Sequence, residues 1–219
     1  MQLKTAMILA AGRGERLKPL TDQTPKPLLP VFGKPLIVYH LEQLAALHFE
    51  KVVINVHYLA QQVMDNLGDG SRWGLQIVYS QEQALLGTGG SMRQALDIIG
   101  SDPFLCIGGD IYTDFPLEKF LSKNWLLENY LMHAVLTDKR PDAKGDFNLV
   151  HNQVMFGEHP EFAYASIGIM DPQIFSAHPY GYATLLSFLQ PIVTAGLVRG
   201  EYYPQVLNIN TLEEYQLLT

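Results

Sequence analysis

The chain is short of cysteine, of positive charge and of long hydrophobic runs, and each shortage excludes a class of protein. Cys106 is the only cysteine, so no internal disulfide can form, and a reducing, cytoplasmic setting is expected. The 15 Lys and Arg against 22 Asp and Glu leave a net charge of −7, which argues against an electrostatic nucleic-acid binder. No apolar stretch is long enough to span a bilayer or to form a signal peptide, so no membrane partner is expected.

Hydrophobic periodicity predicts that strands and helices alternate in the first half of the chain. Of the 219 residues, 47% are hydrophobic, which is enough for the sizeable core of one domain with a small lobe. Predicted strands cover residues 6–10, 51–56, 75–79 and 104–108, and predicted helices cover 35–47, 59–67 and 91–98. This alternation is typical of a doubly wound α/β sheet with parallel strands, in which ligands bind beyond the carboxyl ends of the strands.

Beyond residue 130 the pattern changes to strands with little helix between them, which predicts a mixed sheet and a small lobe. The predicted strands are 131–136, 147–150, 154–156, 164–170 and 205–209. A helix is expected over residues 182–195, where Pro191 should produce a kink or a break. A closing helix is expected over 211–218, with Thr211 as its N-cap and Glu214 at the reciprocal position.

The stretch from Met7 to Pro30 has the composition of a phosphate site. Two glycines, Gly12 and Gly14, follow the first strand, so the backbone can turn sharply and bring its amides close to a phosphate chain. Four cations lie in the same stretch of an otherwise acidic chain: Arg13, Arg16, Lys18 and Lys26. Because Arg and Lys both bind phosphate oxygens, this stretch predicts a triphosphate site.

Two common nucleotide motifs do not fit this stretch. A P-loop ends in Gly-Lys-Ser/Thr, and nothing after Gly12 supplies that ending. The dinucleotide fingerprint needs a third glycine where Leu17 stands, and the second strand ends Asn55-Val56-His57, without an acid to hold a ribose.

The same stretch resembles the signature of the nucleotidyltransferases that make nucleotide sugars. That signature reads small/Ala-Gly-x-Gly-x-Arg-x-x-Pro-Leu-Thr, followed by Pro-Lys-Pro and a further proline. The matching residues are Ala11, Gly12, Gly14, Arg16, Pro19, Leu20 and Thr21, then Pro25, Lys26, Pro27 and Pro30. Within the family, the compact length, residues 67–74 and Gly145-Asp146-Phe147 most resemble the short bacterial uridylyltransferases of cell-wall recycling, which act on N-acetylmuramate 1-phosphate.

The resemblance covers nearly the whole chain and implies a Rossmann-like fold: doubly wound α/β, with a mixed, mainly parallel sheet and a small sugar-binding lobe. It implies one domain over residues 1–219, made of a nucleotide-binding core (1–130), a mainly sugar-binding part (131–204), and a returning strand with closing helix (205–219). The implied partners are a nucleoside triphosphate, with UTP favoured, and a sugar 1-phosphate. The implied cofactor is Mg²⁺, and the expected assembly is a monomer or a small homo-oligomer.

The family's functional positions can be carried over where the motifs match. Catalytic roles fall to Arg16, Lys26 and Asp110. Nucleotide contacts are implied for Leu9, Ala10, Ala11, Gly12, Arg13, Gly14, Gln81, Glu82, Gly87 and Thr88. Sugar contacts are implied for Gly89, Gly109, Asp146 and Ser166, and metal contacts for Asp110 and Asn208.

A second glycine-rich stretch, residues 82–91, is expected as a loop that opens the helix at 91–98 and approaches an anion. In the resembling family this stretch touches the nucleotide, and the residues just before it read the base. Glu82 or Gln81 could accept a hydrogen bond from N3–H of uracil, and a carboxylate there would disfavour cytosine.

The expected metal site departs from the family pattern at its second ligand. Asp110 follows Gly108-Gly109 at the end of the fourth predicted strand, where a carboxylate can hold Mg²⁺ against substrate phosphates. The family's later Asp-x-Gly-Thr reads Asn208-Ile209-Asn210-Thr211 here, so a neutral carbonyl oxygen replaces a carboxylate. Either Mg²⁺ binds more weakly and the triphosphate supplies the missing charge, or activity is lost.

Three functions therefore stay open from the sequence. The first is a sugar-1-phosphate nucleotidyltransferase that joins N-acetylmuramate 1-phosphate to UTP. The second keeps the reaction but uses guanine or thymine nucleotides with mannose or glucose 1-phosphate. The third is a catalytically impaired protein that binds a nucleotide or sugar phosphate, as Asn208 would allow.

Overall fold

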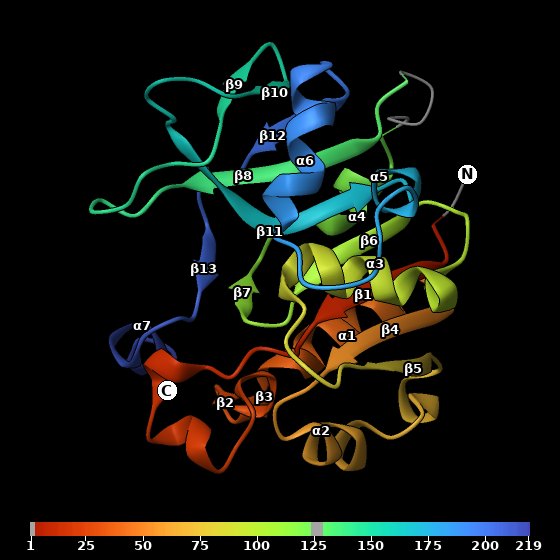
Figure 1. Cartoon of the computed structure of the whole chain (residues 1–219). Helices are drawn as coiled ribbons and strands as arrows, with labels where there is room; N and C mark the ends of the chain where they lie inside the picture. Colours follow the sequence, from red (N-terminus) through yellow and green to blue (C-terminus); the bar gives the residue numbers. More distant parts are fainter. Residues whose placement is uncertain (1–2, 124–128) are drawn as a thin grey trace.

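The molecule is built around one nine-stranded sheet (Figure 1). The computed structural model describes residues 3–123 and 129–219. In spatial order the strands are β5 (Gln76–Gln81), β4 (Lys51–Val56), β1 (Thr5–Leu9), β6 (Phe104–Gly108), β11 (Phe162–Met170), β8 (Met132–Asp138), β12 (Val198–Tyr202), β10 (Gln153–Met155) and β9 (Asn148–Val150).

Strand directions confirm the predicted mixed, mainly parallel sheet. The first four strands, β5, β4, β1 and β6, are parallel to one another. Strand β11 is antiparallel to both β6 and β8, whereas β12 is parallel to β8. Since β10 is antiparallel to β12 and to β9, only β11 and β10 run against the other strands. The carboxyl ends of β1, β4, β5 and β6 therefore meet at one edge.

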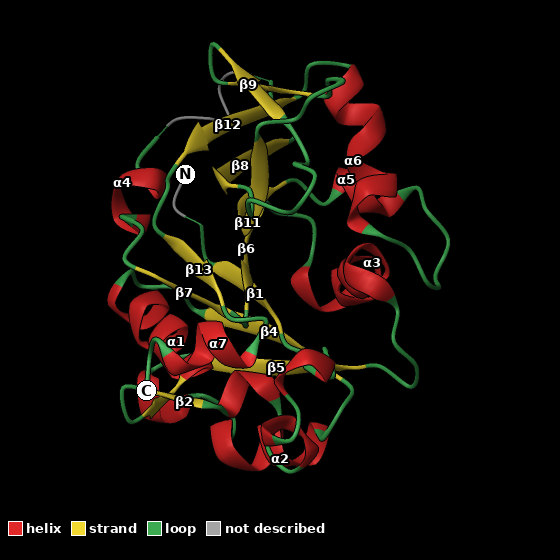
Figure 2. Ribbon diagram, turned by 90° about the vertical axis from the view of Figure 1, so that its left-hand side faces the viewer, coloured by secondary structure: helices red, strands yellow, loops and turns green. Residues whose placement is uncertain are grey.

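Helices cover both faces of the sheet (Figure 2). Helices α1 (Leu36–Ala46) and α4 (Leu117–Leu121) lie on one face, and α3 (Gly87–Ile99), α5 (Gln173–Ser176) and α6 (Leu185–Thr194) lie on the other. Successive side chains of a strand point to opposite faces of the sheet, so the side chains of β1 contribute to a separate core cluster on each face. Ile8 packs in the cluster with Leu41 of α1, whereas Met7 packs in the cluster with Met92 of α3. Helix α2 (Ala60–Leu67) also packs into the first cluster.

The C-terminal segment returns to the N-terminal one. Strand β13 (Val206–Asn208) pairs antiparallel with β7 (Ile111–Thr113), and α7 (Leu212–Gln216) follows. Helix α7 begins with the predicted reciprocal cap between Thr211 and Glu214. Near the β2–β3 hairpin (Pro30–Val31 and Lys34–Pro35), the Tyr215 hydroxyl donates to the Pro30 carbonyl at 2.7 Å. The C-terminal segment therefore packs against β7 and the β2–β3 hairpin.

Helix α3 begins a full turn earlier than the sequence predicts. It starts at Gly87 rather than at residue 91, so the expected glycine-rich loop is largely the first turn of the helix. Glycine costs about 0.8–1.0 kcal/mol relative to Ala in a helix interior, which is why a loop was the better sequence expectation. Tertiary contacts override this preference, because Ala183 donates to the Leu86 carbonyl and Gly90 donates to the Ala183 carbonyl.

Other differences are short elements that the periodicity does not indicate. They are β2, β3, β7, α4, α5 and β12, together with the 3₁₀ turns η1 (Glu15–Leu17), η2 (Leu20–Asp22), η3 (Lys26–Leu28) and η4 (Ser71–Trp73). Helix α6 continues through Pro191 to Thr194, so of the two expected effects of this proline, a kink or a break, the break is wrong. Within the described ranges, no helix has the length and apolar character needed to cross a membrane.

Because α3 is closely packed at Gly90, we expect Gly90→Ala to destabilise the protein. A Cβ atom there would lie 2.2 Å from the Gly181 carbonyl oxygen. Overpacking of this kind costs about 1–3 kcal/mol, more than the helix preference of Ala returns. We expect a lower free energy of unfolding in urea, whereas the exposed α2 variant Gln62→Ala should change it by less than about 0.5 kcal/mol. A Gly90→Ala protein more stable than wild type would show that the contact is not restrictive.

Candidate active site

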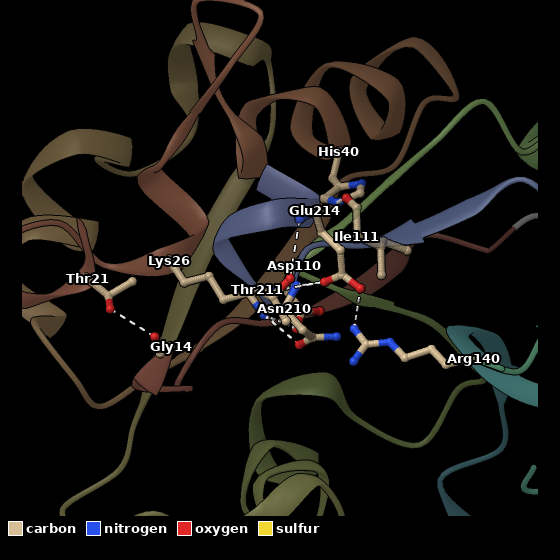
Figure 3. A network of polar contacts seen from close by, with 10 residues as sticks. All are labelled: Gly14, Thr21, Lys26, His40, Asp110, Ile111, Arg140, Asn210, Thr211 and Glu214. Carbon is tan, nitrogen blue, oxygen red and sulfur yellow. Dashed lines mark hydrogen bonds and ion pairs between the residues drawn. The ribbon is translucent and has the colours of Figure 1, made fainter. Parts of the chain in front are cut away.

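The loop after β1 makes its tight turn at Gly14. This residue has a φ of 64°, and a Cβ atom on it would lie 2.7 Å from Cγ2 of Thr21. Its carbonyl accepts from the Thr21 hydroxyl at 2.9 Å and from the Leu17 amide at 2.8 Å (Figure 3). Gly12, by contrast, has open space around the position of a Cβ atom. The loop is therefore closed at Gly14 and open to a ligand at Gly12.

Lys26 brings the N-terminal loop into contact with the end of β6. Its ammonium nitrogen donates to Oδ2 of Asp110 at 2.6 Å and to Oδ1 of Asn210 at 3.1 Å (Figure 3). Lys26 is only 8% exposed, and a buried ammonium requires partners of this kind. Three segments that are remote in sequence thus meet at one cation.

Glu214 fixes the backbone that carries Asn210. Its Oε2 atom accepts from the amides of Asn210 and Thr211 at 2.6 and 3.0 Å, and its Oε1 atom accepts from Arg140 at 2.5 Å. The cap that was predicted for α7 therefore also holds the Asn210 side chain toward Lys26 (Figure 3). Asn210 and Arg140 were not expected to act here, because their spacing in sequence gives no sign of this contact.

A cavity of about 170 Å³ lies between this cluster and the N-terminal loop. Gly12, Gly14, Arg16, Lys26 and Asp110 are among the residues that line it, as are Leu9, Ala10, Gly109 and Asn210. Arg13 and Lys18 are not on its wall, and Lys18 instead pairs with Glu15 at 3.1 Å on the surface. Of the four cations in the motif, Arg16 and Lys26 thus face the cavity, which suits a polyanion.

A second cavity of about 330 Å³ adjoins the first and shares Leu9, Gly12 and Asp110 with it. Ala11, Glu82, Gly87, Thr88 and Ser166 also line it. Together the two cavities reach the size of small-molecule sites, which are about 300–1,000 Å³. They bring most of the expected nucleotide contacts to the carboxyl edge of β1, β5 and β6.

The Glu82 carboxylate is held by other protein groups. It is 6% exposed, and its Oε1 atom accepts from Nδ2 of Asn55 at 2.7 Å. Its Oε2 atom accepts from the Leu86 amide at 3.3 Å, while Oδ1 of Asn55 accepts from the Ala10 amide at 2.8 Å. This chain of bonds links the loop after β1 to the loop after β5. Sequence reasoning missed Asn55, and its only signal was an amide side chain at the end of a buried strand.

Three of the other expected nucleotide and sugar residues have packing roles in the structure. The Gln81 side chain contacts Sδ of Met64 at 3.3 Å and is not on the wall of either cavity. A Cβ atom on Gly89 would lie 2.4 Å from the Phe188 ring, so this glycine allows α3 to pack against α6. Gly109 has a similar role, because a Cβ atom there would lie 2.6 Å from the Leu9 carbonyl oxygen.

Asp110 directly precedes β7, and Asn208 is the last residue of β13, which pairs with β7. The Ile209 amide donates to the Asp110 carbonyl at 2.9 Å, and Asn208 is paired in register with Ile111. His40 of α1 contacts the Ile111 carbonyl at 3.1 Å, and burial lowers the pKa of His40 to about 4, so the ring is neutral. Oδ1 of Asn208 is buried and has no hydrogen-bond partner among the described residues.

Of the expected sugar residues, Ser166 lies in β11 and Asp146 lies beside it, where the Asp146 amide donates to the Phe162 carbonyl. Oδ2 of Asp146 accepts from the Tyr164 amide at 2.9 Å. Ser166 has a φ of 58° and lines the second cavity. A Cβ atom on Gly108 would lie 2.9 Å from the Cβ atom of Ser166. Asp146 lies instead on a third cavity, which shares Tyr164 and Leu185 with the second one. The expected sugar positions are therefore divided between two adjoining spaces.

Known proteins resemble this chain in sequence. The family model described as Nucleotidyl transferase matches residues 5–145. The N-acetylmuramate alpha-1-phosphate uridylyltransferase of Neisseria meningitidis serogroup B is 42% identical over 205 residues, covering 90% of this chain and 84% of that protein. The protein of the same name from Caulobacter vibrioides is 34% identical over 211 residues, covering 90% of this chain and 87% of its own length.

A solved structure shows the same fold. It is described as a glucose-1-phosphate thymidylyltransferase from Bacillus anthracis in complex with a sucrose, and it superposes with a TM-score of 0.87 at 20% sequence identity. The match covers 99% of this chain and 93% of that one. With the family model spanning more than half of the sequence and the two relatives aligned over nearly all of it, the chain belongs to the nucleotidyl transferase family.

Proposed function

We propose that this chain joins N-acetylmuramate 1-phosphate to UTP and releases pyrophosphate. The substrate pair comes from the two relatives that match over nearly the whole chain. The observation that carries the reaction type is the contact of Lys26 with Asp110 on the wall of the cavity that Arg16 and the glycine loop also line. We place the reaction in the cytoplasm, in keeping with the buried free thiol of Cys106.

The chemistry follows from the charges of the reactants. A phosphate oxygen of the sugar 1-phosphate attacks the α-phosphorus of UTP, and the bond from that phosphorus to the bridging oxygen of pyrophosphate breaks. The nucleophile is already anionic, so the protein needs no general base. Its task is to position the two anions and to neutralise charge. Arg16 and the amides from Gly12 to Gly14 would bind the leaving pyrophosphate, and Lys26 would bind the α-phosphate and the incoming phosphate.

Asp110, which follows β6, and Asn208, at the end of β13, fit a Mg²⁺ ion. Mg²⁺ is held in proteins by one or two carboxylates together with substrate phosphates and water, and it needs no all-protein cage. Asp110 would supply the carboxylate, and the buried Oδ1 atom of Asn208, which has no partner among the described residues, would supply a second oxygen. Within the described part of the chain no cluster of three or more His, Cys, Asp or Glu side chains could hold a metal. When bound, Mg²⁺ would neutralise charge on the phosphate oxygens.

A second candidate is a protein that binds the same ligands without turnover. The observation that favours it is Asn208 in place of the family's aspartate. Arg16, Lys26 and Asp110 count against it, because a binding protein has less need of groups arranged around a departing pyrophosphate.

The test is pyrophosphate release with Mg²⁺, offering UTP, ATP, GTP, CTP and dTTP against a panel of sugar 1-phosphates. We expect release with UTP and N-acetylmuramate 1-phosphate. Release only with GTP or dTTP and mannose or glucose 1-phosphate would contradict the proposed substrates but keep the reaction. If no pair in the panel releases pyrophosphate while calorimetry detects UTP binding, the second candidate, a binding protein, is favoured.

Replacing Lys26 by Ala should lower kcat by about 10²–10³-fold, because one preorganised charge beside the α-phosphate is lost. Steady-state kinetics with UTP and N-acetylmuramate 1-phosphate measures this. Lys18→Ala is the matched control, since Lys18 pairs with Glu15 and Asp22 on the surface. It should stay within about twofold of wild type. A Lys26→Ala enzyme with near-normal turnover would remove Lys26 from the mechanism.

Replacing Asn208 by Asp should lower the Mg²⁺ concentration needed for half-maximal activity, because Mg²⁺ prefers a charged oxygen. It should also make thermal stability depend on Mg²⁺, since a buried carboxylate lacks a partner until a cation binds. Mg²⁺ titrations of activity and of the melting temperature measure both effects. Asn208→Ala should shift the activity titration the other way. If neither variant moves either titration, Asn208 does not contact the metal.

A further inference from the structure

The third cavity, which Asp146 lines, has no role in the transfer step. Its volume is about 490 Å³, larger than either of the other two cavities described above. It adjoins the second cavity, because Tyr164 and Leu185 line both. The third cavity is therefore within reach of a substituent on a ligand that occupies the second.

The walls of the third cavity are mainly apolar. Phe147 and Phe156 line it, with their ring centroids 5.5 Å apart. Leu186 and Leu189 of α6 line it as well. Phe156 is 39% exposed and Leu186 is 51% exposed, so apolar surface faces water here in the free protein. An apolar group that enters the cavity would remove this surface from water, which favours binding.

One cation stands on this wall. Lys144 is the only basic residue that lines the cavity, and no hydrogen bond or ion pair of its ammonium is found in the part of the chain that the structure describes. Asp146 lies on the same wall, but its Oδ2 atom accepts from the Tyr164 amide at 2.9 Å. An unpaired ammonium beside an apolar cavity suits an anionic group carried on an apolar one.

We propose that the third cavity binds an apolar, carboxylate-bearing substituent of the sugar phosphate, with Lys144 as the partner of the carboxylate. Phe147, Phe156 and Leu186 contact the apolar part of that substituent. This inference rests on the proposed function, because the lactyl ether of N-acetylmuramate carries one methyl and one carboxylate. The cavity then determines which sugar is used, while Lys26 and Asp110 act on any sugar phosphate.

The test compares N-acetylmuramate 1-phosphate with its methyl ester, which keeps the shape of the substituent and loses its charge. Lys144→Met should lower kcat/KM for the acid by about tenfold, in line with the loss of one charge-assisted hydrogen bond, and leave that for the ester nearly unchanged. Lys144→Arg should restore most of the preference for the acid. Lys139→Met is the matched control, because Lys139 is exposed in the same region and is not on the cavity wall.

A second variant tests the apolar wall separately. Leu186→Trp places a larger side chain at a half-exposed position, so the fold should tolerate it while the cavity is partly filled. We expect lower kcat/KM for both the acid and the ester, and an unchanged value for N-acetylglucosamine 1-phosphate, which lacks the lactyl group.

The outcomes separate this inference from the proposed function. If wild-type protein uses N-acetylmuramate 1-phosphate and Lys144→Met lowers kcat/KM for acid and ester equally or not at all, the inference is wrong and the proposed function stands. If the wild-type protein does not use N-acetylmuramate 1-phosphate with UTP, the proposed function fails, and the inference fails with it.

Discussion

The contact between Lys26 and Asp110 is the interaction on which the rest of the site depends. It joins the N-terminal loop to the end of β6 at 2.6 Å, and Asn210 adds the C-terminal segment at 3.1 Å. A lysine buried to this extent would be costly without these partners. Each group therefore compensates the charge of the other in the free protein. When a nucleotide binds, the Lys26 ammonium can exchange the Asp110 carboxylate for phosphate oxygens.

The fold holds this cluster at one edge by bonds that lie outside it. Asn55 and Glu82 tie the loops after β1 and β5 to the end of β4, and Glu214 holds the Asn210 backbone. On the other side, the glycines of α3 allow the segment before α6 to pack closely, so the N-terminal end of α6 lines two of the cavities. The glycines of this family motif thus serve packing as much as ligand approach.

Sequence reasoning predicted the parts of the structure that depend on local pattern. The strand–helix alternation, the turn at Gly14, the cap of Thr211 and the place of Asp110 all follow from periodicity, backbone freedom or the end of a strand. It missed contacts between residues remote in sequence, among them those of Asn210 with Lys26 and of Asn55 with Glu82. It also placed the start of α3 too late, because the packing of residue 183 on Gly90 outweighs helix propensity.

The central claim is that this cluster directs the sugar phosphate to the α-phosphorus of the nucleotide. A single turnover with N-acetylmuramate 1-phosphate and Mg²⁺, run in parallel with UTP labelled with ³²P at the α or at the γ position, tests it most directly. We expect the α label to enter the nucleotide sugar and the γ label to leave in pyrophosphate. Transfer of the γ label to the sugar, or release of the α label as UMP without a nucleotide sugar, would contradict it.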